Sequence, residues 1–460
     1  MTADTRAPFA ALRGRTPEDL FGRLATPCYI LDEAALRRNG EILAGVAART
    51  GCRFLLAQKA FSNYDCYPVL APYLAGTEAS GLFEARLGWE TLPEKEVHVF
   101  CGAYREEDFS ELLRYAGHIV FNSPAQLAKF GPRAKAAGKH LGLRINPECS
   151  TQKGHAIYDP CAPGSRLGTT RDQWDRHMTP DLVGLLDGLH FHTLCEQDSD
   201  ALEITLEAVA QQFGDLLPRM QWLNMGGGHH ITRPGYDIAR LERCIRRARH
   251  NWGVTVYLEP GEAWALNAGF LASRVLDVTE NGDVKNAILD CSAACHMPDV
   301  IEMPYQPPVY GAVAEAIDCL PEESASQICH SEQSEESVLP ASENPDCLGQ
   351  CAASASNDKM EPWETDPSTP LRSAQDDRSN VYRLGGPSCL SGDVIGDYCF
   401  DHALREGELL LFGDLAIYST CKNNTFNGMP LPQIFRRRED GALEQLTSFG
   451  YADFKYRLGR

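Results

Sequence analysis

Short apolar runs recur through the first part of the chain, and stretches with helical spacing lie between most of them, such as residues 200–213 and 237–251. Alternating strands and helices predict parallel β/α units. Eight such units fit a closed (β/α)8 barrel, a TIM-type α/β fold, which we assign to residues 25–290. The eight runs are residues 54–59, 76–80, 97–100, 118–121, 141–145, 188–192, 221–225 and 254–258.

The pattern changes beyond the barrel. Residues 381–389 and 409–412 are short apolar runs separated by glycine turns, which predicts an all-β, β-barrel-like domain over residues 291–460. The strand-like run at 27–32 precedes the barrel and is a candidate to join that domain. Residues 1–24 are left as an N-terminal tail.

One segment of the C-terminal part does not match a packed domain. Residues 313–380 are rich in Ser, Glu, Asp and Pro and carry 15 acidic against 3 basic residues. Such a composition buries too little apolar surface to offset the entropy of ordering. We therefore expect a disordered insertion in a surface loop, and its role as an acidic interaction arm is the alternative.

Charge and cysteine content limit which partners the protein binds and which cellular compartment suits it. The net charge of −20 argues against nucleic acid as a partner and is compatible with cationic small molecules, although solubility alone explains such a charge. No apolar stretch is long enough to span a membrane, and the N-terminus lacks a signal layout.

The 17 cysteines contain no C-x-x-C pair, which favours a reducing cytoplasm. Cys291, Cys295 and His296 are too few for a zinc site, so we expect no metal.

Lys59 is the first candidate for chemistry, because it ends the apolar run 54–59. Chemistry in a (β/α)8 barrel lies at the C-terminal ends of the strands. An amine beside apolar surface loses solvation of its charged form, and a free amine condenses with an aldehyde. The alternative for Lys59 is a solvated strand end.

A pyridoxal phosphate site needs, besides a lysine, a group that binds the phosphate, an acid at the pyridine nitrogen and a flat group over the ring. Three later strand ends could supply them. Gly226, Gly227 and Gly228 follow the seventh run and could present backbone amides to a phosphate. Glu259 ends the eighth run and could keep the pyridine nitrogen protonated. His192 could stack on the ring; a metal pair with His190 and a structural role are the alternatives.

Arg144 ends the fifth run. It could support either the phosphate or His192, and a surface ion pair is the alternative.

Longer motifs resemble a known family. Residues 57–61, 189–192, 226–230, 259–262 and 386–389 are similar to the alanine-racemase-fold (fold type III) decarboxylases that use pyridoxal phosphate. Within that group, residues 158–168, 192–197, 295–300 and 422–428 resemble the carboxynorspermidine (carboxyspermidine) decarboxylases. The resemblance covers about residues 25–312 and 381–435.

The resemblance implies decarboxylation of carboxynorspermidine or carboxyspermidine in polyamine biosynthesis. It implies that Lys59 forms the cofactor linkage, that His192 stacks on the ring and that Glu259 faces the ring nitrogen. Cys195 and Tyr418 would lie near the phosphate, beside the glycine loop. Cys389 would protonate Cα from the neighbouring subunit, which implies a homodimer with active sites at the subunit interface.

One departure points to the substrate. Ornithine-type relatives have arginine where this chain has Glu262, so an acid replaces a phosphate-binding group. We expect Glu262, Asp299 and Asp393 to pair with the amino groups of a cationic polyamine acid. A decarboxylase or racemase for diaminopimelate, ornithine or lysine, and a non-catalytic carrier of the cofactor, are the rival hypotheses.

Overall fold

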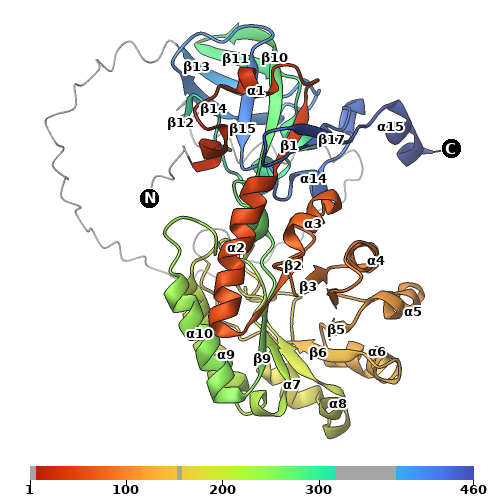
Figure 1. Ribbon diagram of the computed structural model, residues 1–460. Coiled ribbons are helices and arrows are strands. Elements are labelled where there is room, and N and C mark those ends of the chain that lie inside the picture. The colour runs from red at the N-terminus through yellow and green to blue at the C-terminus, as the bar shows by residue number, and fades with distance from the viewer. Residues whose placement is uncertain (1–6, 153–157, 316–379, 460) are drawn as a thin grey trace, which may run out of the picture.

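The computed structural model describes residues 7–152, 158–315 and 380–459. Within them the chain forms a barrel and a separate sheet domain, which lie at opposite ends of the molecule in Figure 1. No described helix is long and apolar enough to cross a membrane. The predicted insertion at 313–380 lies almost entirely outside the described residues.

The barrel consists of eight parallel strands, and each of the predicted apolar runs supplies one of them. The closed order confirms the predicted TIM-type fold. The strands are β2 (Arg53–Ala57), β3 (Gly76–Ala79), β4 (Glu96–Phe100), β5 (His118–Phe121), β6 (His140–Arg144), β7 (Gly188–His190), β8 (Trp222–Asn224) and β9 (Thr255–Leu258).

Helices surround the barrel because the connections between parallel strands must cross back over its outside. Figure 1 shows α9 and α10 on one flank and α4, α5 and α6 on the other. The helices are α2 (Glu33–Thr50), α3 (Tyr67–Leu70), α4 (Leu82–Thr91), α5 (Glu106–Tyr115), α6 (Pro124–Ala136), α7 (Arg171–His177), α8 (Pro180–Leu185), α9 (Ser199–Phe213), α10 (Ile238–Trp252) and α11 (Glu262–Ala265).

The second domain is a nine-stranded, mostly antiparallel sheet. Eight strands follow the order β12-β14-β13-β11-β10-β1-β16-β17, and β15 pairs with β10. These strands are β1 (Cys28–Asp32), β10 (Gly269–Asn281), β11 (Val284–Leu289), β12 (Ala312–Glu315), β13 (Val381–Gly385), β14 (Val394–Phe400), β15 (Leu409–Gly413), β16 (Gln433–Arg437) and β17 (Leu443–Thr447).

The sheet domain draws on three segments of the chain. The opening strand β1 lies between β10 and β16, and β10 and β11 come before residue 290. Residues 313–315, which composition placed in the insertion, instead belong to β12. Their backbone pairs with β14, so main-chain hydrogen bonds hold them in the sheet.

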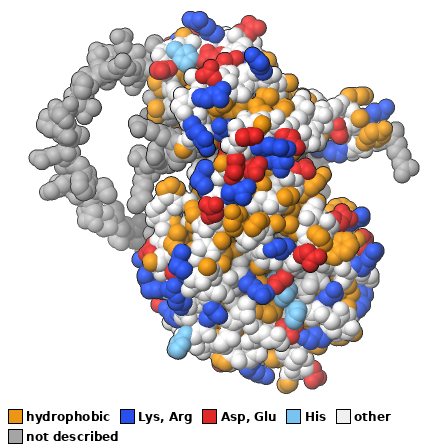
Figure 2. All heavy atoms as spheres, viewed as in Figure 1, with side chains coloured by type: hydrophobic (Ala, Val, Ile, Leu, Met, Phe, Trp, Pro, Cys, Tyr) orange, Lys and Arg blue, Asp and Glu red, His pale blue; other side chains and the backbone are white. Residues whose placement is uncertain are grey.

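Short helices lie between or beyond the strands of this domain: α12 and α13 between β11 and β12, α14 between β15 and β16, and α15 after β17. Helix α15 projects from the body near the C-terminus in Figure 1, and the same face in Figure 2 carries intermixed acidic and basic side chains. The remaining helices are α1 (Pro17–Phe21), α12 (Ala293–His296), α13 (Asp299–Glu302), α14 (Ser419–Lys422) and α15 (Tyr451–Leu458).

Candidate active site

The predicted site residues gather at the C-terminal ends of neighbouring barrel strands. Strand β7 pairs with β8, β8 with β9, and β9 with β2, so these four ends form one continuous arc. His192, the glycine loop, Glu259 and Lys59 follow these strands in that order. Barrel closure therefore brings together residues that are up to 200 positions apart in the chain.

Lys59 lies in the turn after β2, and its side chain is exposed. Its surroundings are acidic, and this corrects the apolar surroundings expected from the sequence. Burial raises the pKa of Glu78 well above its ordinary value, the neighbouring Glu259 raises it further, and the positive charge of Lys59 opposes both. Glu78 is thus a buried carboxyl group with a raised pKa near the candidate amine.

Glu259 is buried at the end of β9 and accepts two hydrogen bonds. His190 Nε2 donates at 3.1 Å and Asn224 Nδ2 at 2.5 Å. Burial pushes the pKa of Glu259 upward, but the charge and hydrogen bond of His190, together with His98 and Asn224, outweigh burial and hold the pKa below its ordinary value. Burial lowers the pKa of His190, and the facing Glu259 opposes that shift. The site therefore contains a buried carboxyl group whose neighbours favour its ionised form.

His192 is held from both sides by its neighbours. Its Nδ1 accepts a hydrogen bond from the Gly227 amide at 2.9 Å, and its carbonyl accepts one from Arg144 at 3.0 Å. Burial lowers the pKa of His192 well below its ordinary value, and the charge of Lys59 adds to this effect. The ring is consequently flat and neutral, as a group that stacks on an aromatic ring should be.

Arg144 is a buried support and makes no surface ion pair. Its guanidinium lies 4.6 Å from the ring centroid of Phe100. Burial lowers the pKa of Arg144 to about 10, so it keeps its charge at neutral pH. Of the two predicted roles, the observed bond to the His192 carbonyl corresponds to support of His192.

The glycine loop cannot carry side chains. Gly226 and Gly228 have φ of 72° and 78°, a region that favours glycine. A Cβ at Gly227 would collide with the Glu259 carbonyl, and one at Gly228 would collide with the Leu194 carbonyl. The loop is therefore packed tightly between the ends of β7 and β9.

A group of acids flanks this arc. Glu262 accepts a hydrogen bond from His230 Nε2 at 2.7 Å, and this bond raises the pKa of His230 even though burial alone would lower it. Asp299 pairs with Lys422. Glu196, which the sequence analysis did not single out, carries a pKa raised by burial and by nearby Glu262.

Cys195 and Tyr418 lie beside this acidic group. Burial raises the pKa of the Cys195 thiol to about 12, with Glu196 adding to the shift, so the thiol stays neutral. The Tyr418 amide donates to the Ala60 carbonyl at 2.8 Å, next to Lys59. The sheet domain therefore reaches the Lys59 turn directly.

Cys389 and Asp393 occupy the loop between β13 and β14. Cys389 is exposed, and its amide donates to Asn427 Oδ1 at 2.8 Å. Asp393 does not join the acidic group as predicted. Its carboxylate is buried and accepts hydrogen bonds from Ser388, Ser292 and the Ala294 amide.

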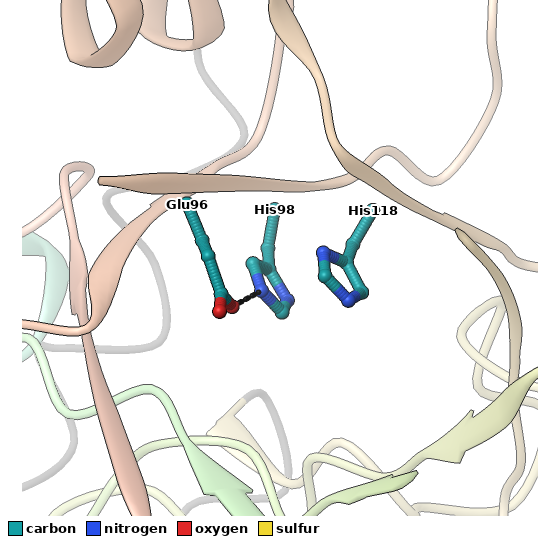
Figure 3. A group of neighbouring side chains, drawn as sticks. All are labelled: Glu96, His98 and His118. Carbon is teal, nitrogen blue, oxygen red and sulfur yellow. Dashed lines mark hydrogen bonds and ion pairs between the residues drawn. The ribbon is translucent and has the colours of Figure 1, made fainter. Parts of the chain in front are cut away.

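A separate cluster of possible metal ligands lies near the N-terminal ends of β4 and β5. Glu96, His98 and His118 are neighbours there (Figure 3). The two imidazole rings stack face to face, with centroids 3.9 Å apart and planes 9° apart, so their lone pairs run side by side instead of converging on one point. Glu96 is also bonded to Arg53. This arrangement does not form a converging ligand set.

Known proteins resemble this chain in sequence and in fold. No protein-family model matches the chain. It is 36% identical over 437 residues to a carboxynorspermidine/carboxyspermidine decarboxylase of Campylobacter jejuni, with 95% of this chain and 99% of the relative covered. The chain belongs to the carboxynorspermidine/carboxyspermidine decarboxylase family. This membership confirms the resemblance read from the motifs, and the protein is an enzyme, a decarboxylase.

Other relatives agree with this placement. A carboxyaminopropylagmatine decarboxylase of Synechocystis is also 36% identical, with 95% of this chain and 96% of the relative covered. The crystal structure of the C. jejuni carboxynorspermidine decarboxylase with norspermidine has a TM-score of 0.75 at 35% identity and covers 94% of this chain and 100% of that one. The Helicobacter pylori diaminopimelate decarboxylase with L-lysine, at 15% identity and a TM-score of 0.70, covers 96% of this chain and 99% of that one and shares the fold.

Proposed function

We propose that this enzyme uses pyridoxal 5′-phosphate to decarboxylate carboxynorspermidine, carboxyspermidine or both, which yields norspermidine or spermidine. The observation that carries the proposal is Glu259, a buried carboxylate held ionised by His190 and Asn224 next to the Lys59 amine. Its negative charge suits a protonated pyridine nitrogen. When bound, the cofactor supplies an electron-poor ring that takes up the electron pair left by the departing carbon dioxide.

The surrounding residues fit the other parts of the cofactor. Lys59 would hold its aldehyde carbon, and His192 would cover its ring. The glycine loop at residues 226–228 would lie at its phosphate, with help from Tyr418 and Cys195. The Gly226 and Gly227 amides already donate to Asn224 Oδ1 and His192 Nδ1, so the Gly228 amide is the one that would bind the phosphate. Tight packing of the glycine loop against the Phe191, Glu259 and Leu194 carbonyls supports this role, because it fixes the backbone at the end of β8.

The acidic group supports a cationic substrate. Glu262 is engaged by His230, and Asp299 by Lys422. Among the described residues, Glu196 makes no ion pair and faces the same space. A polyamine tail would gain charge-assisted hydrogen bonds there. The distal carboxylate of diaminopimelate would meet like charge in the same place, which disfavours that rival.

Cys389 is the proposed proton donor to Cα, and we place it in the site of a partner subunit. Its exposure in the single chain supports this arrangement. Helix α15 adds an uncovered apolar surface, with Tyr451, Tyr456 and Leu458 exposed to 74%, 78% and 67%. Residues of this kind are typical of an interface with a second copy.

The equal similarity to the Synechocystis relative raises a second substrate, carboxyaminopropylagmatine, which ends in a guanidinium group. Parallel assays of all three carboxylated polyamines with diaminopimelate, ornithine and lysine, read by mass spectrometry, separate these candidates. We expect carbon dioxide release from a carboxylated polyamine. Release from diaminopimelate alone, or cofactor binding without any release, would overturn the proposal.

Two variants test the binding of the substrate tail. We expect Glu196→Gln and Glu262→Gln each to raise KM by about tenfold to a hundredfold while kcat changes little, because each removes a charge-assisted bond to the tail. Glu280→Gln, an exposed acid on β10, is the matched control. Unchanged KM in both variants would remove these acids from the tail site.

A further inference from the structure

Asp393 is a buried carboxylate with no part in the site described above. It is 4% exposed, and three donors surround it. Ser388 Oγ donates to Oδ2 at 2.6 Å, while Ser292 Oγ and the Ala294 amide donate to Oδ1 at 2.9 Å and 3.2 Å. Burying a charge is costly unless such bonds satisfy it, so this residue has a specific structural task.

The task concerns the loop that carries Cys389. The Gly386 amide donates to the Asp393 carbonyl at 2.9 Å, and the Asp393 amide donates to the Leu390 carbonyl at 3.0 Å. A Cβ at Gly386 would collide with the Asp393 carboxylate, so the two ends of the loop are in close contact. Asp393 thereby closes residues 386–393 into a compact turn.

Cys389 lies between two anchors of this turn. Ser388, the preceding residue, is tied to Asp393, and the Cys389 amide itself is tied to Asn427. Ser292 connects the same carboxylate to the start of α12, 101 positions earlier in the chain. The backbone of Cys389 is therefore fixed on both sides while the residue stays exposed.

We propose that Asp393 is a positioning residue that acts through Ser388 to aim the Cys389 thiol at Cα of the substrate. This inference rests on the proposed role of Cys389 as proton donor. In that step the S–H bond breaks, a C–H bond forms at Cα, and the thiolate regains a proton from water. A displacement of about 1 Å is enough to slow such a transfer severely.

A misplaced Cys389 thiol and a destabilised protein can be told apart by the products they form. If the proton went to the bound cofactor instead of Cα, water would release the rest of the substrate as an aldehyde and its amino group would stay with the cofactor. Each such event would release carbon dioxide without the amine product. The ratio of amine to carbon dioxide therefore reports where the proton goes, whereas a general loss of stability lowers both products together.

Hydrogen exchange of the full-length protein without added cofactor tests the anchor itself. We expect Ser388→Ala to speed amide exchange within residues 386–393 by at least about tenfold, since it removes a hydrogen bond to a carboxylate. Ser388→Thr keeps the hydroxyl and should restore slow exchange. Ser391→Ala, the same change at an exposed position of the loop, is the matched control. Unchanged exchange in Ser388→Ala would overturn the inference.

Product stoichiometry of the holoenzyme then tests the consequence. We expect one amine per carbon dioxide in the wild type, Ser388→Thr and Ser391→Ala, and a lower ratio in Ser388→Ala and Asp393→Asn. If Cys389→Ala keeps a ratio of one, the proposed proton donor is wrong. If Cys389→Ala lowers the ratio and Ser388→Ala does not, Cys389 keeps its role and the positioning inference alone is overturned.

Discussion

At the scale of single residues, the charge of the site depends on which groups donate hydrogen bonds to the Glu259 carboxylate. Burial raises the pKa of a carboxyl group that has no donors, as it does for Glu78 in the same site. Two donors, from β7 and β8, favour the ionised form of Glu259 instead. The pKa values of two carboxyl groups of the same site are thus shifted in opposite directions, a separation that enzymes use to assign distinct tasks.

The charge of Glu259 can be removed without changing its shape. We expect Glu259→Gln to lower kcat by about 10²–10³-fold at saturating cofactor, because a preorganised charge facing the ring is lost. Asn224→Ala removes one donor and keeps the carboxylate, so its loss should be smaller, about tenfold. Steady-state kinetics on both variants checks the order, and a Glu259→Gln enzyme within tenfold of wild type contradicts it.

Asp414 gives a pH-dependent prediction. Burial, with a further contribution from Glu262, raises its pKa to about 7. The folded protein therefore holds a proton that the unfolded chain releases near about pH 4, so stability falls as pH rises from about 4 to 7. Above that range the full cost of the buried charge is present.

The variant Asp414→Asn should remove this cost. Asparagine can accept the same Asn267 amide bond and tolerates the left-handed φ of 58°. We expect it to gain on the order of 2 kcal/mol at pH 8 and nothing near pH 4. Urea unfolding across this range measures the difference, with the exposed Asp283→Asn as control. A gain that does not depend on pH would contradict the assignment.

At the scale of elements, α2 joins the two domains. It begins directly after β1 of the sheet domain and runs along the barrel in Figure 1. Asp32 caps it through the Ala35 amide at 2.7 Å and also pairs with Arg437 of β16 at 2.9 Å. One side chain therefore fixes both the start of the helix and its position on the sheet.

Removal of the Asp32 carboxylate should lower the free energy of unfolding. We expect Asp32→Ala to cost about 3–5 kcal/mol, because it leaves Arg437 buried without its partner and removes a helix cap. Asp32→Asn keeps a capping oxygen, so its loss should be smaller. Urea unfolding of both variants measures the difference, and equal losses would mean that the cap contributes nothing.

At the scale of the whole molecule, we propose that a second copy completes the site. Lys59 belongs to the barrel and Cys389 to the sheet domain, and no contact between them is found among the described residues. In a dimer with shared sites, each site would take Lys59 from one subunit and Cys389 from the other.

Mixed dimers test this arrangement. Lys59→Ala and Cys389→Ala should each be nearly inactive alone, and an equal mixture after subunit exchange should regain about a quarter of the wild-type sites. Activity of the mixture, compared with each variant treated in the same way, is the measurement. No recovery despite proven exchange would place both residues in the same subunit.

Local sequence patterns were sufficient to predict the barrel and the residues at the ends of its strands. The apolar runs mark the strands, and chemistry at a known end of parallel strands brings Lys59, His192 and Glu259 together. Glu78 and Asn224 were missed because each lies inside a strand, where sequence alone does not show what faces it. The burial of Asp393 and its bonds to Ser388 and Ser292 could not be foreseen, because its partners lie partly in a distant segment of the chain.

The sequence by itself determined the barrel, the β-rich second domain and the motifs of the family, because apolar periodicity and turn chemistry act over a few neighbouring residues. Only the tertiary structure decided the direction of the pKa shift at Glu259, the burial of Asp393 and the order of the strands on either side of β1 in the second sheet. These features depend on contacts between segments brought together when the barrel closes and the sheet forms. Solvation and pKa follow from that shared space, which no local stretch of sequence contains.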